Sequence, residues 1–262
     1  MERIHLHCNV FGSGSRALLA FHGFGQESSC FMPLATALPD YTVYAVDLFF
    51  HGQSLWHHPL QPVTRTKWKQ LISELLEHHH IEEFDLIGFS MGGRIALVTY
   101  ELFADCIKQL WLLAPDGIKS NAWYRLATRS RLLHGLFRYI TSEKSNAFHH
   151  SMKVLHRYKL LSPTLAKIVS QQMRTPELRK RVYNTWMVYR HLEPDLQAIY
   201  KAALQFGPKI MIATGSYDRI IRPHYMKRLT RLLSNLCVHK VFPCGHQDLL
   251  QVWLNEVSAA NK

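Results

Sequence analysis

The stretch "FDLIGFSMGGRIALVTYELF", residues 84–103, decides the fold. Its first part, ending at Phe89, is a short apolar run typical of a buried strand, whereas its second part repeats apolar residues at helical spacing. No loop separates the two parts. Ser90 stands at the junction with glycines on both sides, so the chain must turn sharply from strand into helix. Such a turn presents the Ser90 hydroxyl beside the unpaired N–H groups of the helix N-terminus, and we therefore predict that Ser90 is a nucleophile.

Strand-like and helix-like segments alternate on both sides of this junction. Strands are expected at Ile4–Val10, 17–25, 41–50, 107–117, 208–218 and 236–246, and helices at 30–39, 66–80, 223–235 and 248–262. This alternation predicts an α/β fold, with a mostly parallel sheet covered by helices on both faces. Between 117 and 205 the strands disappear and the pattern is helical. We predict a core formed by 1–116 and 206–262, interrupted by a helical insertion at 117–205.

Further reactive side chains follow other predicted strands. Asp218 ends "ATGSYD" and His246 ends "PCGH". Active groups gather at the carboxyl ends of strands in such sheets, and the chain order Ser, Asp, His is one of the known orders of a catalytic triad. Asp116, at the end of the strand at 107–117, is an alternative acid. Asp248 is too close to His246 in sequence to orient its ring.

At this point the sequence resembles the α/β-hydrolase superfamily over essentially the whole core. The resemblance rests on "HGFG" (22–25), "DLFFHGQS" (47–54), "GFSMGG" (88–93), "GSYD" (215–218) and "CGH" (244–246), all in the family's order. The insertion falls where the family places its cap. One departure is Phe49-Phe50, where the family often has Pro-Gly.

The resemblance implies a role for each residue of the site. Ser90 attacks a carbonyl, His246 transfers its proton, and Asp218 orients the imidazole. The backbone N–H groups of Phe24 and Met91 are implied to receive the oxyanion. A serine at the elbow excludes the Asp or Glu nucleophiles of dehalogenase and epoxide-hydrolase relatives.

We expect neither a cofactor nor a metal ion. The histidine runs at 57–58, 78–80 and 149–150 consist of neighbouring residues, whose side chains point apart on a helix. His22 and His51 are expected to shape their loops by hydrogen bonding.

The positive charge is unevenly distributed. Of 31 Lys and Arg and 19 Asp and Glu in the chain, 16 and 4 lie between Ile118 and Gln205, so this segment carries a net +12 and the remainder a net 0. A basic cap of this kind would attract an anionic partner: an acyl group on a carrier protein or coenzyme A, or an anionic lipid surface. The alternative is an ordinary solvated helix face. Nucleic acid is not an expected partner, because no aromatic and basic recognition module is present.

The composition also bears on location. No apolar stretch is long enough to span a membrane, and "MERIHLHCNV" lacks the apolar segment of a signal peptide. Five scattered cysteines without a C-x-x-C pair are typical of a reducing compartment. We expect a cytoplasmic protein.

These observations favour a serine hydrolase of a small to medium carboxylic ester or thioester. The basic cap resembles that of capped carboxylesterases of the pimeloyl-carrier-protein methyl esterase type. Phe24, Trp186 and Tyr189 are candidates for the substrate pocket, although core packing explains the last two equally well. The alternatives are a C–C bond hydrolase or lyase of the same fold, and a non-catalytic ligand receptor.

Overall fold

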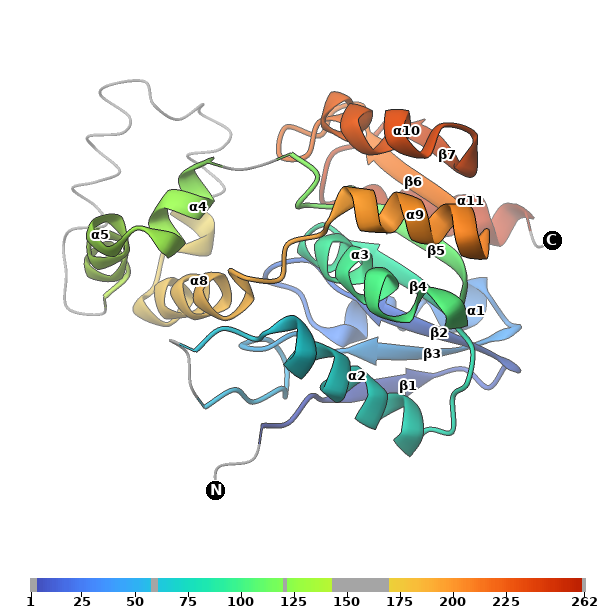
Figure 1. Ribbon diagram of the computed structural model, residues 1–262, viewed down its shortest axis with the longest axis horizontal. Helices are drawn as coiled ribbons and strands as arrows, with labels where there is room; N and C mark the ends of the chain where they lie inside the picture. Colours follow the sequence, from blue (N-terminus) through green and yellow to red (C-terminus); the bar gives the residue numbers. More distant parts are fainter. Residues whose placement is uncertain (1–3, 58–60, 120–121, 143–169, 261–262) are drawn as a thin grey trace. The chain divides into compact units, whose positions relative to one another are not determined.

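The computed structural model describes residues 4–57, 61–119, 122–142 and 170–260. Within these residues, seven strands form one sheet in the order β1-β3-β2-β4-β5-β6-β7 (Figure 1). They are β1 (Cys8–Phe11), β2 (Arg16–Phe21), β3 (Tyr41–Val46), β4 (Phe84–Phe89), β5 (Ile107–Leu113), β6 (Lys209–Gly215) and β7 (Cys237–Phe242). Only β1 runs antiparallel to its neighbour in this described sheet. The predicted α/β fold with a mostly parallel sheet is confirmed.

The first strand is shorter and later than its pattern suggested. The alternation predicts a strand at Ile4–Val10, whereas β1 spans Cys8–Phe11. Cys8 pairs with Val46, the last residue of β3. Beyond this pair the Asp47 N–H still donates to the His7 carbonyl (2.9 Å), but β3 has ended, and an isolated bridge joins His5 to Leu55.

Helices cover both faces of the sheet. These helices are α1 (Leu34–Ala37), α2 (Arg65–His78), α3 (Met91–Phe103), α9 (Leu196–Phe206), α10 (Lys227–Leu233) and α11 (Leu249–Ala260). In Figure 1, α2, α3 and α9 lie in front of the sheet and α1 and α11 lie behind it. The buried residues of α2 are those that its periodicity indicates: Trp68, Leu71, Ile72, Leu75 and Leu76.

Residues 56–63 and 121–191 form a second compact unit. Its described helices include α4 (Ala122–Arg129), α5 (Arg131–Thr141) and α8 (Pro176–Tyr189). The sequence predicts a wider insertion, 117–205, but 192–205 group with the sheet unit. The reason is that α9 buries Leu196, Ile199 and Ala203 and packs against α3 and α10. That the second unit acts as a cap stays a prediction.

Candidate active site

The turn at Ser90 is as sharp as its sequence indicates. β4 ends at Phe89 and α3 begins at Met91, leaving Ser90 alone between them. Ser90 has φ 54° and ψ −115°, a sparsely populated backbone conformation that costs on the order of 1–3 kcal/mol. Backbone hydrogen bonds hold it on both sides: the Ser90 N–H donates to the Leu113 carbonyl at the end of β5 (2.9 Å), and the Ser90 carbonyl accepts the N–H groups of Gly93 (2.9 Å), Arg94 (3.4 Å) and Asp116 (2.9 Å).

Close packing at the turn requires glycine. A Cβ at Gly92 would lie 1.9 Å from the Phe21 carbonyl oxygen at the end of β2, and one at Gly88 would lie 2.5 Å from the Gly92 carbonyl oxygen. Any other residue would push the start of α3 away from the sheet. The glycines therefore bring the helix N-terminus to the strand ends, where the serine hydroxyl emerges.

Ser90, His246 and Asp218 form a continuous hydrogen-bonded series. The Ser90 Oγ lies 3.0 Å from His246 Nε2, and His246 Nδ1 lies 2.6 Å from Asp218 Oδ2. An ionised carboxylate only accepts hydrogen bonds, so Nδ1 carries the proton and donates to Asp218. The lone pair of Nε2 then faces the Ser90 hydroxyl. This arrangement allows the imidazole to take the serine proton.

The Asp218 carboxylate is held rigidly. Its side chain is fully buried, and its Oδ1 accepts the N–H groups of Ile220 (2.7 Å) and Ile221 (2.8 Å). The other oxygen is thereby directed at His246. The ring of His246 also lies 5.1 Å from that of Phe89, the last residue of β4.

The register of the last two strands explains why Asp218 and His246 meet. Gly215 of β6 pairs with Phe242 of β7. Beyond that pair, the Tyr217 N–H donates to the Cys244 carbonyl (3.1 Å). Asp218 and His246 therefore lie a similar number of residues beyond the Gly215–Phe242 pair, after the ends of two neighbouring parallel strands.

Asp116, the alternative acid, lies elsewhere in the hydrogen-bond network. Its backbone N–H donates to the Ser90 carbonyl (2.9 Å), whereas its carboxylate lies 4.0 Å from the Arg94 guanidinium. It therefore supports the backbone of the turn, and the structure places Asp218 against His246.

Two buried histidines brace the loop that carries Phe24. His22 Nε2 accepts the Leu48 N–H (2.9 Å), so its protonated Nδ1 donates to the Gly23 carbonyl (2.8 Å). His51 Nε2 accepts the Gly25 N–H (3.0 Å), and its Nδ1 faces the Phe49 carbonyl (3.2 Å). Both rings are neutral when they accept these bonds. They shape their loops, as the sequence predicts, and the Phe24 ring packs edge-on against His51.

Asp47 in turn fixes the loop that carries His51. Its carboxylate accepts the N–H groups of Ser28 (2.8 Å) and Gln53 (2.9 Å). Burial by itself would raise the pKa of Asp47, but these hydrogen bonds outweigh it and lower the pKa below its usual value. Within the same loop Phe50 has φ 68°, a conformation that favours glycine. This position is where the sequence departs from the family's Pro-Gly.

The remaining site candidates are Met91 on α3 and two aromatic residues of α8 in the second unit. Met91 is the first residue of α3, so its N–H has no acceptor within the helix. Tyr189 is fully buried, and Trp186 packs its ring against those of Tyr124 and Phe137 within the second unit. The oxyanion role of Phe24 and Met91 and the pocket role of Phe24, Trp186 and Tyr189 stay predictions.

Neighbouring basic residues of the second unit differ in their exposure to solvent. In α8, Arg179 is buried, its Nη1 lying 3.4 Å from the Met173 carbonyl oxygen, whereas Lys180 is exposed. The histidine pair His149 and His150 lies outside the described residues. Among the described residues, no group of three His, Cys, Asp or Glu side chains has the arrangement of a metal site, and no helix is long and apolar enough to cross a membrane.

Comparison with known proteins identifies the family. A family described as alpha/beta hydrolase fold matches residues 16–251. The chain belongs to this family. Its relatives include "Uncharacterized hydrolase YugF" of Bacillus subtilis (24% identical, covering 89% of this chain and 84% of the relative). "Lipase 1" of Psychrobacter immobilis is 22% identical over 89% of this chain and 72% of its own.

Solved structures of this α/β-hydrolase fold agree with the architecture. An esterase from Thermogutta terrifontis has a TM-score of 0.69 at 17% identity, covering 98% of this chain and 92% of its own. A meta-cleavage product hydrolase from Pseudomonas fluorescens has a TM-score of 0.64 at 16% identity, covering 98% and 93%. At these identities the likeness shows the fold, and the reaction has to be argued from the site.

Sequence reasoning missed one group of residues. Lys119, Lys227, Arg228 and Arg231 lie around a single pocket. Averaging the charge over everything outside 118–205 hid Lys227, Arg228 and Arg231, because acidic residues elsewhere in the core balance the basic helix α10. Counting charge along the 219–247 segment alone finds six Lys and Arg and no Asp or Glu.

Proposed function

We propose that this protein is a serine hydrolase of carboxylic esters or thioesters with a small to medium acyl group. The observation that carries the proposal is the series Ser90–His246–Asp218, with a proton acceptor facing the serine hydroxyl at 3.0 Å. Supporting it are the family membership and the names of its relatives, which include a lipase and an esterase.

In the proposed reaction, the Ser90 Oγ attacks the carbonyl carbon while its proton passes to His246 Nε2. The carbonyl oxygen becomes an oxyanion that the N–H groups of Phe24 and Met91 stabilise. The intermediate collapses, the bond to the leaving oxygen or sulfur breaks, and His246 returns its proton to that atom. The acyl group now remains on Ser90.

Deacylation repeats the same steps with water. His246 takes a proton from the water, whose oxygen attacks the acyl carbon, and the proton then goes to the Ser90 Oγ as the acid leaves. Throughout, Asp218 holds the imidazole in one tautomer and stabilises its charged form. The two N–H groups that Asp218 accepts keep its carboxylate in place for both steps.

The second candidate is a C–C bond hydrolase, because a meta-cleavage product hydrolase has a similar fold over nearly the whole of both chains.

The natural acyl donor is also part of the proposal. An acyl group on an anionic carrier, as in carboxylesterases of the pimeloyl-carrier-protein methyl esterase type, would suit the basic segment 118–205.

The test uses p-nitrophenyl esters from acetate to laurate. We expect rapid turnover, and Ser90→Ala should lose on the order of 10⁶ in kcat if the triad acts as a unit. A fluorophosphonate probe should label the wild type and not this variant. The control is Ser216→Ala, at an exposed serine of the Asp218 loop, which should retain wild-type activity and labelling.

Two results would contradict parts of the proposal. Labelling at a serine other than Ser90 would refute the nucleophile. Labelling at Ser90 without turnover of any ester would favour the C–C bond hydrolase.

A further inference from the structure

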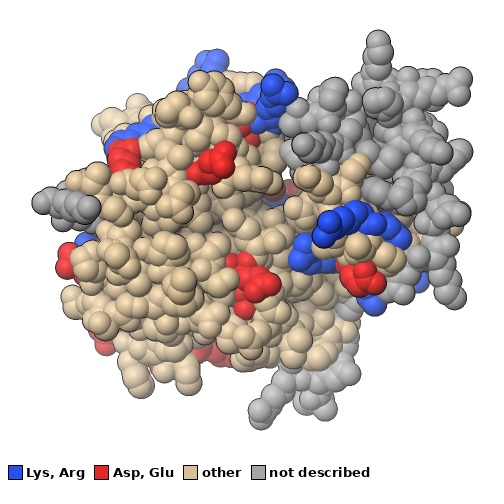
Figure 2. Space-filling view, turned by 180° about the vertical axis from the view of Figure 1, so that it is seen from behind, with Lys and Arg blue, Asp and Glu red and all other residues tan. Residues whose placement is uncertain are grey.

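A basic pocket lies on the sheet unit, apart from the triad. Its volume is about 780 Å³. Four of its lining residues are cationic, namely Lys119, Lys227, Arg228 and Arg231, while His224 and Tyr225 contribute rings, and no acidic residue lines it. In Figure 2, Lys and Arg side chains gather along the upper edge of the molecule, the edge at which Figure 1 shows α10.

These four cations are not neutralised within the described chain. Of the other basic residues of 219–247, Lys240 pairs with Glu256. By contrast, no described carboxylate lies within ion-pair distance of Lys119, Lys227, Arg228 or Arg231. Like charges around one hollow repel each other. An anion in the pocket would remove this repulsion.

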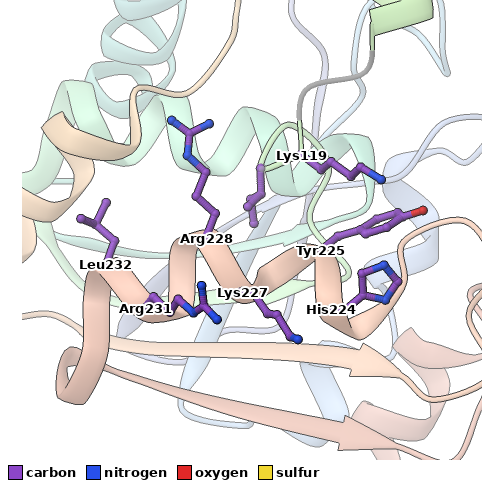
Figure 3. A pocket seen from close by; sticks show the side chains of 8 residues that line it. Lys119, His224, Tyr225, Lys227, Arg228, Arg231 and Leu232 are labelled. Carbon is purple, nitrogen blue, oxygen red and sulfur yellow. The ribbon is translucent and has the colours of Figure 1, made fainter.

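The side chains come from two segments that are distant in sequence. Lys119 follows β5, and its Nζ lies 4.1 Å from the centroid of the Tyr225 ring, which holds the ammonium group over the pocket wall. Figure 3 shows Lys119 extending along Tyr225, with Arg228 rising from α10 on the other side of the loop that bears Lys119. The pocket is thus a joint product of the two segments.

The donors indicate the ligand's chemistry. A guanidinium group matches phosphate oxygens with two parallel N–H bonds, and a lysine adds a point charge. Two arginines and two lysines exceed what a single carboxylate needs. They suit a group with two or more negative charges, such as one or more phosphates.

The pocket walls are also tied closely to the triad by the chain. Lys119 comes three positions after Asp116, whose N–H donates to the Ser90 carbonyl. His224 comes six positions after Asp218. Since an extended chain spans at most about 3.6 Å per residue, these walls lie within roughly 10 Å and 20 Å of those two residues. A long substrate can reach from one place to the other.

We propose that this pocket binds the phosphate-bearing end of an extended substrate whose acyl carbonyl lies at Ser90. The proposal rests on the proposed ester or thioester hydrolysis. It places the recognition of the anion on α10 and Lys119, in the sheet unit. Free phosphate shares this chemistry, so binding and kinetics are both needed to distinguish the two sources.

The binding experiment titrates inorganic pyrophosphate into the full-length protein by calorimetry at low salt. The test variant is Arg228→Gln with Arg231→Gln, two exposed residues. The matched control is Lys67→Gln with Lys69→Gln on α2, which removes the same charge from another helix. We expect the test variant to weaken binding at least about tenfold and the control to weaken it less than about twofold. Equal weakening by both variants, or no binding to the wild type, would overturn the proposal.

The kinetic experiment compares two donors of one acyl group, p-nitrophenyl butyrate and butyryl-coenzyme A, of which only the second bears phosphates. We expect the test variant to lower the ratio of kcat/KM for the thioester to that for the neutral ester by about tenfold, mainly through KM. The control variant should keep the ratio. An unchanged ratio in a variant that no longer binds pyrophosphate would overturn the proposal, because the pocket would then hold free phosphate only. Pyrophosphate binding without hydrolysis of either butyryl donor would refute the proposed function and leave the anion pocket in place.

Discussion

The orientation of His246 depends on a single acceptor. Its Nδ1 donates to Asp218 Oδ2 at 2.6 Å, and this bond fixes which ring nitrogen faces Ser90. The carboxylate itself cannot turn, because its second oxygen accepts two backbone N–H groups. An amide at position 218 would present an N–H group to one of these partners and would support the wrong tautomer.

We therefore expect Asp218→Asn to lower kcat by about 10⁴ with the fold intact. Asp116→Asn should lower kcat far less, because the Asp116 carboxylate lies near Arg94 and its contact with Ser90 is through the backbone N–H. Ester turnover and melting temperature of both variants check this. The opposite ranking, in two variants that melt like the wild type, would assign the acid to Asp116.

At the scale of elements, two loops cooperate to position the backbone near the nucleophile. The loop at 22–25 is held by His22 and His51. The loop at 47–54 is held by Asp47. The position of the Phe24 N–H thus depends on side chains of a different loop.

Removing the His51 ring should loosen this arrangement. His51→Ala leaves the Gly25 N–H without its protein acceptor and removes the ring against which Phe24 packs. We expect kcat to fall by roughly 10- to 100-fold with a smaller change in KM, because an oxyanion forms only in the transition state. His78→Ala, on the exposed side of α2, is the control. A wild-type kcat for His51→Ala would show that the loop keeps its shape unaided.

At the scale of the whole molecule, Glu101 joins three distant parts of the sheet unit. This residue of α3 pairs with Arg65 at the start of α2, and its Oε1 accepts the Asp195 N–H (2.8 Å) just before α9. Its side chain is only 4% exposed. Burial raises the pKa of Glu101 to about 7, although Arg65 and the Asp195 N–H oppose the shift.

This pKa makes stability depend on pH. Folded Glu101 holds its proton more tightly than the unfolded chain does, so its contribution is complete below about pH 4.5 and is lost as the pH rises to about 7. Glu101→Gln should remove this loss. Relative to the wild type, the variant should gain stability in urea between pH 5 and pH 8.

At each pH, the stability of the wild type is subtracted from that of Glu101→Gln, because other groups in both proteins also titrate. Burial lowers the pKa of His239 and of His79, which gives the opposite slope, but these contributions cancel in the difference. Glu74→Gln, at an exposed position of α2, is the control and should run parallel to the wild type. Parallel profiles for Glu101→Gln and the wild type would contradict the raised pKa.

The sequence by itself determined the fold class and the residues at the centre of the site. Period-two and helical patterns are local, so the alternation of strands and helices was visible without coordinates. The turn at Ser90 was equally local, because glycine at neighbouring positions is what lets α3 start against the sheet. The chain order of Ser90, Asp218 and His246 followed from the same reasoning.

Only the tertiary structure decided which groups meet. Asp116 and Asp218 both follow strands, and the pairing of Gly215 with Phe242 is what brings Asp218 to His246. The end of β3 set where β1 begins, and packing on α3 drew α9 into the sheet unit. Lys119 and Arg228 line one pocket although a long stretch of chain separates them. The physical reason is common to all of these: local patterns fix each segment's conformation, whereas strand register and the burial of apolar faces fix which distant segments become neighbours.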